Sequence, residues 1–218
     1  MTFCLTVTID KPEKNIRIDQ AVILLHGYGG DGKDISILTL NWKRFLPNTI
    51  FLCPNGNEKC AINPAGYQWF DLTKDDPEYI LEQSKKAELK IKQFIEEVKS
   101  QYNLKNSQIC LSGFSQGCMM SINLGLTSNE SYNCVVGFSG KIINQDDLLK
   151  RKSCSAKILL LHGDLDKVVS PTFLLEAKDF LIRNNIEIET NIIKNCEHSI
   201  PVESSSMALN YIKNNFKI

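Results

Sequence analysis

Short runs of strand-forming residues alternate with helical patterns along this chain of 218 residues. Between two of these runs, apolar residues over positions 87–102 fall at three- and four-residue steps among charged ones, which predicts a long amphipathic helix. Such alternation is typical of a mostly parallel sheet that is covered by helices. The predicted strands are residues 21–25, 49–53, 108–112, 134–138, 158–161 and 186–193.

Two further helices are predicted near the C-terminus, and one long segment shows no periodicity. The helices begin at Pro171 and Pro201 and reach about residues 183 and 216. The segment 54–77 is rich in Asn, Gly and Pro but contains Tyr67, Trp69 and Phe70, which is typical of an ordered functional loop. The chain length fits one domain that spans residues 1–218.

The charge and hydropathy of the chain argue against two classes of partner. Lys plus Arg and Asp plus Glu both number 25, without a block of one sign, so we expect no nucleic-acid binding. The longest aliphatic runs, at residues 22–25 and 158–161, are much shorter than the roughly 20 residues of a membrane-spanning helix. We therefore expect a protein that does not span a membrane.

Cysteine and histidine usage indicates the compartment and the metal content. The first ten residues lack the features of a secretory signal, and the eight cysteines include no CxxC pair, so we expect reduced thiols in a cytoplasmic protein. The three histidines are His26, His162 and His198, and they are far apart in the sequence. This spacing predicts no metal site, and no cofactor is expected.

A candidate nucleophile lies in the sequence GFSQG at residues 113–117. It follows a predicted strand and precedes an apolar segment that begins at Met119, which is the context that a GxSxG elbow requires. A strand-to-helix turn this tight needs glycine on both sides of Ser115 and displays the hydroxyl beside a helix N-terminus. Cys118 is close in sequence but does not occupy the apex of the turn, so we expect it to serve packing.

Candidates for an acid and a base follow in the order that this elbow requires. The strand 158–161 runs into His162-Gly-Asp164-Leu-Asp166, and we favour Asp166 because Asp164 is expected to hydrogen-bond the backbone of its own loop. Only His198 follows these aspartates. His26 and His162 each precede a glycine directly after a strand, so loop backbone is expected to satisfy their side chains. Ser115, His198 and Asp166 would form a nucleophile, base and orienting acid.

Oxyanion stabilisation needs backbone N–H donors, and the glycine-rich turn His26 to Gly30 follows a strand where one is expected. The candidates are the N–H groups of Tyr28 and Gln116. A phosphate cradle in the same turn is disfavoured because no GK[ST] follows and the spacing does not match GxGxxG.

Five motifs together resemble the phospholipase/carboxylesterase family, which includes the acyl-protein thioesterases. They are HGYGGDGKD at 26–34, GYQWFDL at 66–72, GFSQG at 113–117, HGDLDKVV at 162–169 and EHSIP at 197–201. The resemblance implies an α/β-hydrolase fold with a mostly parallel central sheet, helices on both faces and no separate cap domain. It implies the triad and oxyanion roles given above, a pocket wall formed by the loop 54–77, and a substrate contact for Trp69, whose alternative role is core packing.

The resemblance implies hydrolysis of carboxylic esters through an acyl-enzyme on Ser115, with a small-molecule or lipid ester as substrate. Cys118 stands where relatives usually have glycine, and Lys167 where the thioesterase branch tends to have proline. These departures leave an acyl-protein thioesterase as the alternative. A noncatalytic module that binds an acyl group or a protein is a more remote alternative, and association into a homodimer stays open.

Overall fold

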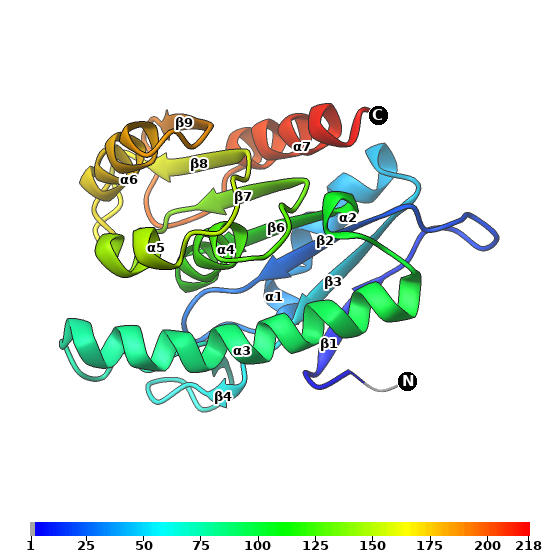
Figure 1. Cartoon of the computed structure of the whole chain (residues 1–218). Helices are drawn as coiled ribbons and strands as arrows, with labels where there is room; N and C mark the ends of the chain where they lie inside the picture. The colour runs from blue at the N-terminus through cyan, green and yellow to red at the C-terminus, as the bar shows by residue number, and fades with distance from the viewer. Residues whose placement is uncertain (1–2) are drawn as a thin grey trace.

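The computed structural model describes residues 3–218, which are built around a seven-stranded sheet with the order β1-β3-β2-β6-β7-β8-β9 (Figure 1). β1 (Val7–Asp10) pairs antiparallel with β3 (Thr49–Pro54), and all the other neighbours pair in parallel. The parallel strands are β2 (Gln20–Leu25), β3, β6 (Ile109–Phe114), β7 (Cys134–Phe138), β8 (Ile158–Gly163) and β9 (Ile188–Ile193). All six predicted strands are confirmed.

Helices cover both faces of this sheet, because successive side chains of a buried strand point to opposite sides. In β2, Ile23 and Leu25 pack into one hydrophobic cluster and Val22 and Leu24 into the other. The first cluster includes α3 (Pro77–Tyr102), α4 (Gln116–Leu126), α5 (Gln145–Arg151) and α6 (Thr172–Arg183). The second includes α1 (Gly32–Ile35), α2 (Ile37–Trp42) and α7 (Val202–Phe216). Figure 1 shows α3 and α7 on opposite sides of the sheet.

The elements that the sequence pattern did not predict are short or half-buried. They are β1, the two-residue strands β4 (Glu58–Lys59) and β5 (Tyr67–Gln68), the helices α1, α2 and α5, and the 3-10 helices η1 (Lys43–Phe45) and η2 (Asn106–Gln108). The long helix α3 also begins ten residues before the predicted segment, at Pro77. The Asp76 side chain caps it by accepting hydrogen bonds from the N–H groups of Glu78 and Tyr79.

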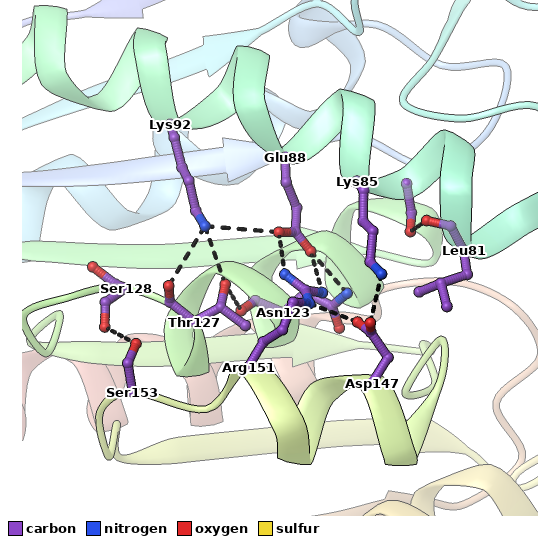
Figure 2. Close-up of polar contacts among 11 residues, drawn as sticks. Leu81, Lys85, Glu88, Lys92, Asn123, Thr127, Ser128, Asp147, Arg151 and Ser153 are labelled. Carbon is purple, nitrogen blue, oxygen red and sulfur yellow. Dashed lines mark hydrogen bonds and ion pairs between the residues drawn. The ribbon is translucent and has the colours of Figure 1, made fainter.

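An ionic cluster centred on the buried Glu88 joins three helices on the α3 face (Figure 2). Glu88 of α3 is 3% exposed and accepts two hydrogen bonds from the Arg151 guanidinium of α5, at 2.8 and 3.0 Å. Asn123 of α4 donates to the same carboxylate at 3.1 Å, and the Lys92 ammonium lies 3.7 Å away. Because its charge and its lone pairs are matched, Glu88 ties α3 and α5 to α4.

Residues 3–218 contain no membrane-spanning helix, no disulfide bond and no metal-binding cluster. No helix in this range combines the length and the apolar composition that crossing a bilayer requires. All eight cysteines carry free thiols. Three or more His, Cys, Asp or Glu side chains do not gather in a metal-binding arrangement in this part of the chain.

Candidate active site

Ser115 lies at the apex of the turn between β6 and α4, in a conformation that most residues avoid. Its φ is 52° and its ψ is −114°, which costs of the order of 1–3 kcal/mol. The flanking glycines permit close approach of backbones: a Cβ on Gly113 would lie 2.3 Å from the carbonyl of Gly117, and one on Gly117 would lie 2.0 Å from the oxygen of Leu25. The α4 N-terminus therefore presses directly on β6 and β2.

Asp166 and His198 are brought together from loops that follow β8 and β9. The Nδ1 atom of His198 lies 2.7 Å from Oδ2 of Asp166, and a carboxylate can only accept, so Nδ1 carries the proton. This leaves Nε2 of the neutral ring as the acceptor. Asp164, the other candidate acid, instead accepts a hydrogen bond from the Cys196 N–H at 3.3 Å. Asp166 is thus the aspartate that orients the imidazole.

The Asp166 carboxylate is held in its ionised form by a full set of donors. Oδ1 accepts the N–H groups of Val168 and Val169, both at 2.9 Å, and Oδ2 also lies 3.2 Å from Nε2 of His162. Burial alone raises the pKa of this carboxyl, but the hydrogen bonds from His198, Val169 and Val168 outweigh it and lower the pKa below its ordinary value. The carboxylate therefore stays charged while it fixes the ring of His198.

The elbow and the His198 loop meet at an aromatic contact. The rings of Phe114 and His198 have their centroids 4.7 Å apart and are inclined by 42°. Within residues 3–218, Ser115 Oγ forms no hydrogen bond with His198 or with any other group. Such bonds are commonly long or misaligned in the absence of substrate. The structure thus brings His198 beside the elbow without the final serine–imidazole hydrogen bond.

The two backbone N–H groups that are candidates for oxyanion stabilisation have no acceptor within the described range. One belongs to Tyr28 in the loop after β2, and the other to Gln116, the first residue of α4, which has no intrahelical partner. The N–H groups of the next two residues both have acceptors, since Gly29 donates to Tyr67 O at 2.9 Å and Gly30 donates to Gly27 O at 3.1 Å. The N–H groups of Tyr28 and Gln116, the two candidates from the sequence, are thus without an acceptor, and their role at an oxyanion stays a prediction.

A mainly apolar groove of about 380 Å³ opens beside His198. Its walls include Ile35 and Leu38 from the α1–α2 segment, Phe114 from the elbow and Ile200 after His198. The expectation that the loop 54–77 forms the pocket wall is wrong for this groove, because no residue of that loop lines it. Sequence reasoning missed Ile35 and Leu38, although their three-residue spacing, continued at Trp42, is a helical signal.

Trp69 lies in the interior of the protein. Its side chain is 0% exposed, and the indole N–H donates to the His26 carbonyl oxygen at 2.9 Å. Its ring stacks on the imidazole of His26 with centroids 5.0 Å apart. A substrate contact would require the pocket to reach this buried ring, so that role stays a prediction.

The other two histidines are satisfied by backbone, as expected. His26 donates from Nδ1 to Gly27 O at 2.7 Å and accepts the Gly56 N–H at Nε2 at 2.8 Å, and burial lowers its pKa. His162 donates from Nε2 to Val169 O at 2.8 Å. Cys118 is 1% exposed, and burial raises the pKa of its thiol to about 12. These groups support the loops of the site.

Known proteins are similar to this chain over most of its length. The profile of the Phospholipase/Carboxylesterase family matches residues 8–216. Acyl-protein thioesterase 1 of Yarrowia lipolytica is 25% identical over 214 residues, covering 90% of this chain and 92% of its own. Esterase YpfH of Escherichia coli is 25% identical over 210 residues, covering 94% and 86%.

Solved structures show the same fold. The crystal structure of esterase PE8 superposes with a TM-score of 0.91 at 31% identity, covering 96% of this chain and 98% of the esterase. Arabidopsis thaliana SOBER1 superposes with a TM-score of 0.76 at 21% identity, which supports the fold alone. The chain therefore belongs to the phospholipase/carboxylesterase family of hydrolases and has the α/β-hydrolase fold.

Proposed function

We propose that this protein hydrolyses carboxylic esters with Ser115 as nucleophile, His198 as general base and Asp166 as orienting acid. The observation that carries the proposal is the 2.7 Å hydrogen bond between Asp166 and His198 beside the strained Ser115 elbow. This bond leaves Nε2 of His198 free to accept a proton, which the serine hydroxyl must lose to become a nucleophile at neutral pH. No cofactor is needed for this chemistry.

The reaction takes two steps. Ser115 Oγ attacks the ester carbonyl carbon while its proton passes to Nε2 of His198, and the N–H groups of Tyr28 and Gln116 stabilise the oxyanion that forms. Collapse of this intermediate breaks the bond to the alcohol, which leaves with the proton from His198. Water then attacks the acyl carbon while one of its protons passes to His198. The bond from the acyl carbon to Ser115 Oγ breaks, the acid leaves, and the proton passes from His198 to Oγ, which restores the hydroxyl.

The groove beside His198 supports an ester with an apolar group. Ile35, Leu38, Phe114 and Ile200 line the same groove as Tyr28 and His198. A volume of about 380 Å³ lies in the range of small-molecule pockets. A thioester is the second candidate, because acyl-protein thioesterase 1 of Yarrowia lipolytica is similar over 90% of this chain.

Labelling with a fluorophosphonate tests the assignment. The wild-type protein should gain one covalent adduct on Ser115, while Ser115→Ala should gain none and should lose turnover of a p-nitrophenyl ester. Ser170→Ala serves as the control, because Ser170 is exposed and its hydroxyl pairs with that of Thr172. Undiminished turnover in Ser115→Ala would overturn the proposal, and a wild-type protein that gains no adduct would favour a noncatalytic module. Rates for an oxygen ester and a thioester of the same acyl group decide between the two substrates.

A further inference from the structure

The side chain of Gln116 makes contacts that its backbone role does not require. It is 0% exposed. Its Oε1 accepts the backbone N–H of Trp69 at 2.8 Å, and its Nε2 donates to the backbone carbonyl oxygen of Phe70 at 2.6 Å. A backbone N–H can only donate and a carbonyl can only accept, so these partners fix the orientation of the amide. One carboxamide thus hydrogen-bonds the backbone of two consecutive residues, Trp69 and Phe70.

The segment that Gln116 holds is also bound to the loop that carries Tyr28. Tyr67 donates to Gly30 O at 2.8 Å and accepts the Gly29 N–H at 2.9 Å. The Trp69 indole N–H donates to His26 O at 2.9 Å. Residues 67–70 therefore bridge the turn 26–30 on one side and the first residue of α4 on the other.

Each end of this bridge lies at one of the two backbone donors proposed for the oxyanion. Tyr28 N–H lies between the anchored residues His26 and Gly29, and Gln116 N–H belongs to the residue whose side chain holds the bridge. We propose that the Gln116 carboxamide is a positioning residue, which sets the placement of the Tyr28 N–H relative to the Gln116 N–H through residues 67–70. The inference rests on the proposed function, in which these two donors stabilise the oxyanion.

Substitution Gln116→Glu separates this role from packing, because the new side chain has nearly the same shape. Ionised, it can accept the Trp69 N–H but cannot donate to Phe70 O. Protonated, it can do both. Burial raises the pKa of a carboxyl group, so protonation should occur within a pH range in which the protein is assayed. The bridge should therefore be broken at neutral pH and restored as the pH falls.

The expected result is a kcat for p-nitrophenyl ester hydrolysis that is about 10- to 100-fold below wild type at pH 8 with little change in KM, since loss of a single oxyanion donor costs about 10²- to 10³-fold. The ratio of variant to wild-type kcat should rise between pH 8 and pH 5. Division by the wild-type kcat at each pH removes the pH dependence that the two proteins share. At pH 8, amide hydrogen exchange of residues 26–30 should be faster in the variant than in wild type.

Gln108→Glu is the matched control. Its carboxamide also accepts a backbone N–H, from Lys105 at 3.0 Å, and donates to a backbone carbonyl, of Asp19 at 2.7 Å, but it lies before the amino end of β6. Its kcat ratio to wild type should stay near one at every pH. Gln116→Met, which keeps the volume without the hydrogen bonds, should show the lower kcat at all pH values.

The outcomes distinguish this proposal from the function on which it rests. An unchanged kcat in folded Gln116→Glu, or a kcat ratio that does not rise at low pH, would overturn the positioning role while an inactive Ser115→Ala leaves the esterase assignment standing. Unchanged exchange at residues 26–30 would also overturn it. Retained turnover in Ser115→Ala would overturn both.

Discussion

Replacing Asp166 with Asn tests whether the carboxylate controls the tautomer of His198. The Asn oxygen must take the Oδ1 position, because the N–H groups of Val168 and Val169 both point there at 2.9 Å. The amide NH₂ then replaces Oδ2, 2.7 Å from Nδ1 of His198. As a donor it requires Nδ1 to accept, which moves the ring proton to Nε2 and leaves His198 unable to take the proton of Ser115.

The expected loss in kcat follows from this exchange. A wrong tautomer at the base costs about 10⁴-fold in serine proteases, which corresponds to about 5 kcal/mol of transition-state stabilisation. The NH₂ group would also face the N–H of His162, whose Nε2 lies 3.2 Å from Oδ2. We therefore expect an additional loss of about 1–3 kcal/mol in the free energy of unfolding.

Steady-state hydrolysis of a p-nitrophenyl ester gives kcat, and urea denaturation gives the free energy of unfolding. Asp164→Asn is the control, because Asp164 contacts the Cys196 N–H rather than His198. Its kcat should stay within about tenfold of wild type, a much smaller loss than the roughly 10⁴-fold loss expected for Asp166→Asn. A folded Asp166→Asn protein with a kcat within tenfold of wild type would refute the reasoning.

Two further predictions concern stability. Arg151→Met removes the guanidinium that donates two hydrogen bonds to the buried Glu88. It should lower the free energy of unfolding, measured by urea denaturation, by about 3 kcal/mol. A loss below about 1 kcal/mol would show that this ion pair contributes little to stability. Burial lowers the pKa of His26, so the unfolded chain binds the proton first and stability should fall as the pH drops below about 6.5. His26→Gln, which cannot titrate in this range, should show a weaker pH dependence, and identical slopes for both proteins would count against this account.

The sequence allowed the central fold to be predicted because buried parallel strands read as short apolar runs. The six such runs all became strands of the sheet. The edge strand β1 was not predicted, because its residues are only half-buried and it therefore lacks a run of apolar residues. The first ten residues of α3 were not predicted, because Asp76 and Pro77 are as typical of a loop as of a helix N-terminus.

The positions of the candidate residues were predictable for a topological reason. The carboxyl ends of parallel strands meet at one edge, so the loops after β2, β6, β8 and β9 had to converge. The wall of the groove was not predictable, because it depends on where short segments pack. Trp69 turns inward to hydrogen-bond His26 O, and the short helices α1 and α2 supply the apolar lining instead. The side-chain role of Gln116 likewise depends on a contact with residues 46 and 47 positions earlier in the chain.

All eleven residues of α4 are buried, and this has a consequence for how the protein tolerates change. The unfavourable backbone angles of Ser115 persist only because the helix behind it has no room to shift. Substitutions far along α4, as at Asn123, which anchors Glu88 of α3, should therefore alter the reactivity of the serine as well as the melting temperature. Sequence variation that tunes substrate preference without this penalty is expected in the segments that line the groove, because they pack on the other face of the sheet from α4.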